Sequence, residues 1–218
     1  PDKKSTLRVV VHSFFVVPFI IAIFGLMIFL VVRIMTSEPN TAQDYLEDVK
    51  IGGSTKRWQG AFELSKILSN PKLVPKDDRF VSEMISIFEY ASNDRDIRVR
   101  QYLAMAMGAT KDPRYGPVLI QALENTEPAM AMTAAYALGN IGHDPAMRSL
   151  IALLDHDVPN VRLQAVISLG KINNPEAIPS LKQMMEDPEA NVRWDAAIAL
   201  AKQKDNSGQR ILLDLMDR

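Results

Sequence analysis

The chain has 218 residues, of which 47% are hydrophobic and 23% charged, so it can form one sizeable domain or a short array of repeats. It has no cysteine, which excludes disulfide bonds, thiolate metal sites and cysteine nucleophiles within it. Residues 34–218 hold 21 Lys and Arg against 25 Asp and Glu, a balance that argues against nucleic-acid binding because such proteins present a basic face.

Hydrophobic residues are concentrated near the N-terminus. Residues 9–32 have no charged side chain over 24 positions, and as an α-helix they would span roughly 36 Å, enough to cross a bilayer. The alternatives are a soluble core helix, which rarely stays apolar on every face for this length, and a cleavable signal peptide, whose apolar core is normally shorter. We predict an uncleaved transmembrane helix at residues 9–34, in which Gly25 is a candidate contact with another membrane helix.

Charges around this segment predict its orientation. Lys3, Lys4 and Arg8 precede it, whereas only Arg33 and Lys50 follow it closely. The positive-inside bias therefore places residues 1–8 in the cytoplasm and the rest of the chain on the periplasmic side of a bacterial cytoplasmic membrane. Residues 35–41 are polar and contain a proline, so we expect them to form a linker.

A block of sequence recurs from residue 42 to the C-terminus. NVRLQAVISLGKI at residues 160–172 matches NVRWDAAIALAKQ at residues 191–203, and the same 31-residue register extends back to Ala131 and Arg100. A fifth copy, RWQGAFELS, begins at Arg57 and is followed by an insertion of about 12 residues. Each copy follows another helical segment and a break that contains proline or Asp. The repeating unit is therefore predicted to be a helical hairpin, and hairpins of this size bury their apolar sides by stacking.

The repeat resembles a known family. Its pattern A-[IV]-P-x-L, then D, then N-V-R-x-x-A and A-L-G is similar to the HEAT repeat, in particular the short type found in phycobilisome lyases. The resemblance implies an all-α fold, with a transmembrane helix followed by an α-solenoid of about five hairpins at residues 42–218 and a terminal helix from Gly208. It also implies that the second helices line a concave face and that the chain acts as an interaction scaffold.

Arginine recurs at one position of the repeat. The equivalent residues are Arg57, Arg100, Arg162 and Arg193, and only Ala131 departs. We predict that these arginines form a structural ladder, in which each guanidinium binds loop carbonyls and an acidic residue of the preceding turn, such as Asp94, Asp157 or Asp187. An anion-binding ladder is the alternative.

Catalytic and metal-binding patterns are lacking in the sequence. The histidines are His12, His143 and His156, none is followed by Glu, and none recurs at the repeat period, so the iron site of some HEAT-repeat enzymes has no ligands. The glycines at Gly52 and Gly53 lack the lysine of a phosphate loop, and no serine lies in a nucleophile elbow. We predict no cofactor and no enzyme activity.

The remaining candidate is a surface on the second helices. With Val161, Ala165 and Leu169 as core, the opposite stripe carries polar edges and a middle row of small residues, which suits a groove for a partner helix or extended segment. The predicted partner-binding residues are Gln59, Glu63, Lys66, Tyr102, Thr133, Asn140, Gln164, Ser168, Lys171, Asp195 and Lys202.

The sequence thus favours a membrane-anchored protein–protein interaction scaffold, an accessory subunit of a multi-subunit membrane complex. Its predicted partners are other protein subunits and, through residues 9–32, the lipid bilayer, with no nucleic acid. The alternatives are a tethered chaperone or sensor that captures peptides and, further away, a lyase-like enzyme that handles a cofactor.

Overall fold

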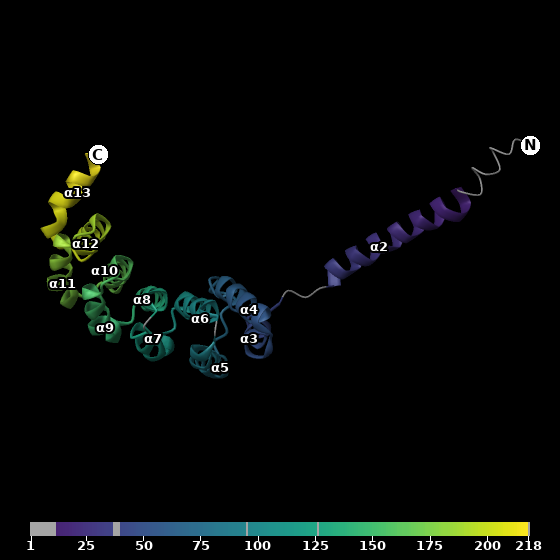
Figure 1. Ribbon diagram of the computed structural model, residues 1–218, viewed down its shortest axis with the longest axis horizontal. Coiled ribbons are helices and arrows are strands. Elements are labelled where there is room, and N and C mark those ends of the chain that lie inside the picture. Colours follow the sequence, from purple (N-terminus) through teal and green to yellow (C-terminus); the bar gives the residue numbers. More distant parts are fainter. Residues whose placement is uncertain (1–11, 37–39, 95, 126, 218) are drawn as a thin grey trace, which may run out of the picture. The chain divides into compact units, whose positions relative to one another are not determined.

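The computed structural model describes residues 12–36, 40–94, 96–125 and 127–217 (Figure 1). The chain divides into two compact units, Pro1–Asn40 and Thr41–Arg218. The predicted cytoplasmic flank with Lys3, Lys4 and Arg8 lies outside the described residues, as do residues 37–39 of the predicted linker and the side chain of His12.

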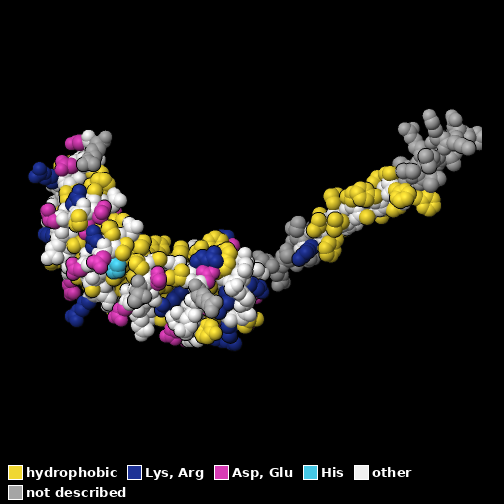
Figure 2. Space-filling model, viewed as in Figure 1, with side chains coloured by type: hydrophobic (Ala, Val, Ile, Leu, Met, Phe, Trp, Pro, Cys, Tyr) yellow, Lys and Arg dark blue, Asp and Glu magenta, His cyan; other side chains and the backbone are white. Residues whose placement is uncertain are grey.

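The described residues of the first unit form a mainly apolar helix. A π-helical turn, η1 (His12–Val16), leads into α2 (Val17–Thr36). The window Phe14–Arg33 has a mean hydropathy of 3.1, and none of it is buried. Figure 2 shows hydrophobic side chains over nearly the whole visible surface of α2. By length and hydropathy, α2 is able to cross a membrane. Its lack of burial distinguishes it from the core helix of a soluble protein, which would be mostly buried. A signal sequence has the same properties.

The second unit is an α-solenoid of five helical hairpins followed by a last helix, and its described residues contain no β-strand. The first helices of the hairpins are α3 (Ala42–Ile51), α5 (Asp78–Tyr90), α7 (Gly116–Leu123), α9 (Met147–Ala152) and α11 (Ile178–Gln183). The second helices are α4 (Ser54–Ile67), α6 (Ile97–Thr110), α8 (Pro128–Ile141), α10 (Pro159–Ile172) and α12 (Ala190–Lys202), and α13 (Gln209–Met216) ends the array.

Short 3-10 turns join these helices: η2 (Ala91–Asn93), η3 (Pro113–Tyr115), η4 (Asp144–Ala146), η5 (Leu153–Asp155), η6 (Pro175–Ala177), η7 (Met184–Glu186) and η8 (Asn206–Gly208). Proline is the first residue of α8 and α10, where its missing N–H costs no hydrogen bond. The left-handed region recurs after the second helices, at Lys111, Gly142, Asn173 and Lys204, each 31 residues from the next. This conformation ends a helix and turns the chain toward the next hairpin.

The second helices pack side by side through small residues. A Cβ atom added to Gly139 would lie 2.9 Å from the Cα of Ser168 in the next hairpin, and one added to Gly170 would lie 2.8 Å from the Cβ of Ala199. Gly108 meets Ala137 in the same way, at 2.7 Å from its Cα. The spacing of the hairpins is therefore set by backbone-to-backbone contact, with no room for a larger side chain at the glycine.

We predict that Gly139→Val lowers the free energy of unfolding by roughly 1–3 kcal/mol, because the added methyl groups force α8 and α10 apart. Chemical denaturation followed by circular dichroism measures this. Gly53→Ser is the matched control, since Gly53 has open space around it and a φ of −67° that serine adopts readily. A Gly139→Val chain as stable as the control would show that the contact does not set the spacing.

Candidate functional site

The second helices form the inner face of the curved second unit. Figure 1 shows α6, α8, α10 and α12 on the inside of the curve, with α5, α7, α9 and α11 on the outside. Residues three, four and seven positions after the repeated arginine position point toward the first helices and are buried throughout. Residues two, five and nine positions after it lie on the opposite side of each helix. These three rows make up what we call the inner face.

The middle row of the inner face is apolar in all five hairpins. Its members are Phe62, Met105, Tyr136, Ile167 and Ile198. The first three are 37%, 38% and 38% exposed, and the two isoleucines are half-buried. The Phe62 and Tyr102 rings, which belong to neighbouring hairpins, meet edge to face with centroids 5.2 Å apart. Exposed aromatic and methionine side chains in one row are the residue types that anchor protein partners.

A hollow of about 440 Å³ lies among the first three hairpins on this face. Phe62, Tyr102, Met105 and Tyr136 give it an apolar lining, and Lys66 stands at its edge. The Lys66 ammonium is 5.2 Å from the centroid of the Phe62 ring. In Figure 2, hydrophobic side chains are visible along the inner edge of the curve, among polar and charged ones. The hollow thus suits a partner side chain that is apolar and has an acidic neighbour.

Lysine and asparagine flank the apolar row on one side. Lys171 donates to Asn140 Oδ1 at 2.8 Å, across neighbouring hairpins, and its ammonium lies 4.7 Å from the Tyr136 ring centroid. Lys66 pairs with Glu63 at 2.9 Å, and Lys202 is exposed near the end of the row. Burial raises the pKa of Asp195, an effect that Lys202 partly offsets.

The structure brings only part of the predicted stripe together. Lys66, Tyr102 and Asn140 line the same hollow. Gln59, Thr133 and Gln164 stand in one flanking row: Gln59 is exposed, Thr133 donates to Ala129 O within its own helix, and Gln164 donates to Ser168 Oγ at 3.1 Å. Gly25 in the first unit has no other part of the chain within 4 Å of its hypothetical Cβ.

The prediction that Ser168 binds a partner is wrong. Ser168 is fully buried, and its hydroxyl donates to Ala135 O of the preceding hairpin at 2.8 Å. The small residues six positions after the repeated arginine, Ala106, Ala137, Ser168 and Ala199, are buried between adjacent second helices and form no groove floor. Ala137, Ser168 and Ala199 are small because a glycine of the preceding second helix lies against each of them.

The exposed apolar row was missed by the sequence analysis, which chose the sixth position after the arginine instead of the fifth. The signal was present, because the fifth position is large and apolar in every copy while its neighbours at the second and ninth are mostly polar. Such a position is easily taken for core when two other sides of the same helix are also buried.

The repeated arginines link neighbouring hairpins, but the acidic partner of Arg162 is not in the preceding turn, where it was predicted. Arg162 donates through Nε and Nη2 to both carboxylate oxygens of Asp187, at 2.7 and 2.9 Å, and through Nη1 to His156 O at 2.9 Å. The carboxylate therefore comes from the following hairpin and not from the preceding turn, which supplies carbonyls only. Asp157, named as a candidate partner, offers Arg162 its backbone oxygen at 3.3 Å. Arg193 likewise donates to Asp187 O at 2.7 Å.

The remaining two arginines differ from each other. Arg57 Nη2 lies 2.9 Å from Asp94 Oδ2 of the second hairpin, close enough for an ion pair although the atoms lack hydrogen-bond alignment. Arg100 has no ion pair or hydrogen bond with any described side chain; its guanidinium lies over the Phe88 ring, 4.8 Å from the centroid. Burial lowers the pKa of Arg100.

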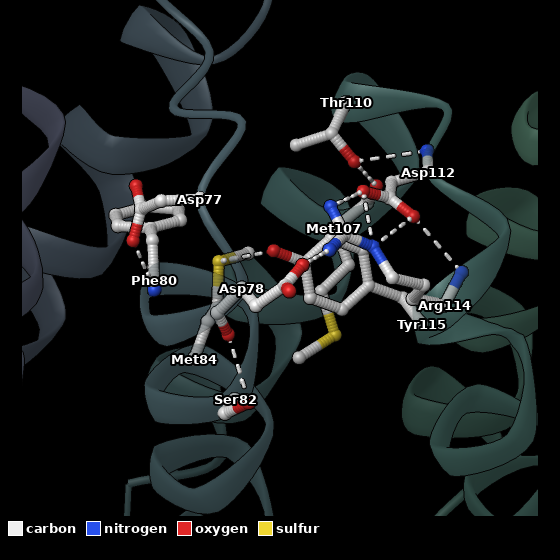
Figure 3. Close-up of polar contacts among 10 residues, drawn as sticks. All are labelled: Asp77, Asp78, Phe80, Ser82, Met84, Met107, Thr110, Asp112, Arg114 and Tyr115. Atoms are coloured by element: carbon white, nitrogen blue, oxygen red, sulfur yellow. Dashed lines mark hydrogen bonds and ion pairs between the residues drawn. The ribbon is translucent and has the colours of Figure 1, made fainter.

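A second cluster of polar contacts joins the second and third hairpins (Figure 3). Arg114 donates to both oxygens of Asp112 and reaches Asp78 at the start of α5. Through its hydrogen bonds, Arg114 lowers the pKa of Asp112. The buried Tyr115 hydroxyl lies 3.6 Å from Met84 Sδ, and burial raises the pKa of Tyr115. Each polar group here has a protein partner, so the cluster holds the two hairpins together.

The two described histidines have structural positions. His156 Nδ1 accepts from the Val158 amide at 3.0 Å, and the His143 ring covers Gly116 so closely that any Cβ there would collide with it. Burial lowers the pKa of His143. Among the described residues, no three His, Asp or Glu side chains are grouped as metal ligands.

Comparison with known proteins identifies the repeat. The family model of HEAT repeats matches residues 86–161 and 147–218. The chain belongs to the HEAT-repeat family. No curated protein matches it in sequence.

Solved structures resemble the HEAT-repeat unit in fold. The complex of CpcE and CpcF of phycocyanin lyase from Nostoc sp. PCC7120 aligns with a TM-score of 0.69 and 21% identity, over 84% of this chain and 73% of that one. A designed armadillo repeat protein in complex with a (KR)4 peptide aligns with 0.53 and 16%, over 75% and 82%. An engineered protein aligns with 0.57 and 20%, over 81% and 85%. At these identities the likeness shows the fold alone, a helical repeat scaffold.

We predict that Asp187→Asn lowers the free energy of unfolding by about 3 kcal/mol, since it leaves the largely buried Arg162 without its carboxylate. Urea denaturation measures the change, and Glu63→Gln, which breaks the exposed pair with Lys66, should cost less than about 0.5 kcal/mol.

Arg162 lowers the pKa of Asp187 in the folded chain. The pair's stabilisation is therefore complete above about pH 4 and is lost as the pH falls below that value. Equal acid sensitivity in the wild type and Asp187→Asn would contradict this.

Proposed function

We propose that this HEAT-repeat protein is a membrane-anchored interaction scaffold and an accessory subunit of a multi-subunit membrane complex. The observation that carries the proposal is that one chain has both a long, mainly apolar helix, α2, and an inner face whose middle row exposes large apolar side chains. α2 holds the repeats at a bilayer, and the inner face binds a protein chain there. Confinement to the membrane raises the effective concentration of the scaffold for membrane partners.

The unburied α2 helix supports membrane anchoring. Phe19, Phe24 and Phe29 are each at least 60% exposed, and such a surface is stable in lipid or against other apolar helices, where Gly25 allows close approach. Lys3, Lys4 and Arg8 before the span favour a cytoplasmic N-terminus, which puts the repeats on the periplasmic side of a bacterial membrane.

The inner face supports protein binding over catalysis. Its hollow is open and lined by Phe62, Tyr102, Met105 and Tyr136, with Lys66 and Asn140 at its edge, and no nucleophile is paired with a base among them. The fixed row of aromatic and aliphatic anchors favours a defined partner over capture of many unrelated peptides. The flanking lysines favour a partner segment that carries acidic residues.

Purification from membranes in mild detergent tests this function. We expect the chain to be recovered at its full mass with a constant set of membrane subunits, because α2 stays attached and the inner face stays occupied. A chain shortened by loss of the apolar segment would identify a cleaved signal sequence. A full-length chain that runs alone as a monomer would contradict the accessory-subunit role.

The membrane orientation is tested separately, by protease digestion of intact cells without their outer envelope. Protease added to intact spheroplasts should digest the repeats, whereas protection there together with digestion after lysis would place the repeats in the cytoplasm.

A further inference from the structure

The arginine ladder has a regular partner position. Asp94 and Asp187, which pair with Arg57 and Arg162, lie at the same place in their hairpins, in the turn between the first and second helices. The equivalent residue facing Arg100 is Asn125. At the third of these four positions in chain order, where Ala131 replaces the arginine, His156 replaces the acid. The repeat therefore keeps the cation at Arg100 but not its internal carboxylate.

Asn125 has no charge and one acceptor oxygen fewer than Asp187, so it cannot give Arg100 the two-oxygen ion pair that Arg162 makes. Asp187 Oδ1 accepts from the Glu189 amide at 2.8 Å and still binds Arg162, while its second oxygen accepts from Arg162 Nε. Asn125 Oδ1 accepts from the Glu127 amide at 2.9 Å in the same turn. The second terminal atom of Asn125 is an NH₂ group, a donor, which cannot accept from a guanidinium.

A hollow of about 400 Å³ lies beside Arg100. It is lined by residues from the turns of the second and third hairpins, among them Asp94, Arg100, Asn125, Glu127 and Met130. Arg100 Nε is covered by protein and makes no hydrogen bond with the residues that the structure describes, so an incoming anion reaches the guanidinium through its terminal nitrogens. A partly buried cation without a counter-charge is unfavourable, and an anion that enters the hollow removes that cost.

We propose that Arg100 is the receptor for a carboxylate of the bound polypeptide, either an Asp or Glu side chain or a chain terminus. The carboxylate takes the role at Arg100 that the Asp187 carboxylate has at Arg162. Carboxylate is favoured over phosphate because Asp94 and Glu127 also line the hollow, and their charge opposes a dianion more than a monoanion. This assignment rests on the proposed function only in naming a protein as the source of the carboxylate.

A hexaglutamate peptide carrying a fluorophore serves as the probe, with fluorescence anisotropy on the full-length chain in detergent at constant ionic strength. Arg100→Gln removes the cation, and Asn125→Asp supplies a carboxylate at the position that Asp94 and Asp187 hold in their hairpins. We expect each substitution to weaken binding about tenfold, the effect of one charge-assisted pair. Arg148→Gln, at an exposed arginine of α9 on the outer side, is the matched control and should leave binding unchanged.

Stability gives a second readout that needs no ligand. Asn125→Asp should raise the melting temperature of the wild-type chain, and the rise should disappear in the Arg100→Gln background, because the new pair needs both residues. Equal binding by wild type, Arg100→Gln and Asn125→Asp would overturn the proposal, as would inorganic phosphate competing as well as free hexaglutamate. If peptide binding depends on Arg100 but the chain co-purifies with no other subunit, the carboxylate site is supported and the accessory-subunit role is contradicted.

Discussion

The contact between glycine on one second helix and a small residue on the next is the constraint on which the rest of the solenoid depends. Gly108, Gly139 and Gly170 each meet the following helix at backbone distance. Because this contact uses the sides of the second helices, and the first helices cover a third side, only one side remains for solvent. The row from Phe62 to Ile198 lies on that side. The exposure of this apolar row is thus a consequence of how tightly the hairpins stack.

Charge pairing adds specificity to this stack. The Arg162–Asp187 pair links two hairpins through both carboxylate oxygens, and Arg162 also holds the backbone of its own turn. Arg57 and Asp94 form the equivalent link between the first and second hairpins. At Arg100 the same frame leaves a guanidinium beside a hollow, so a change of one atom, from a carboxylate oxygen to an amide nitrogen at Asn125, separates a structural tie from a candidate binding point.

The sequence predicted the repeat unit and the fold because a 31-residue period with buried Ala and Leu positions specifies stacked hairpins. It failed at Ser168, since the side of a helix that faces its neighbour depends on the stacking, and a small residue is equally compatible with solvent and with close contact. It also placed the acidic partner of Arg162 in the wrong turn, because spacing along one hairpin says nothing about contacts with the next. The apolar row was visible in the alignment of the copies but was not weighed as surface.

The central claim is that the inner face, and not the outer one, binds the partner protein. Site-specific photocrosslinking in membranes tests it most directly, with benzoylphenylalanine in place of Met105 on the inner face or of Gln121 on the outer helix α7, both of which are exposed. We expect a discrete adduct with a membrane subunit from position 105 and none from position 121. An adduct from position 121 with none from position 105 would contradict the account.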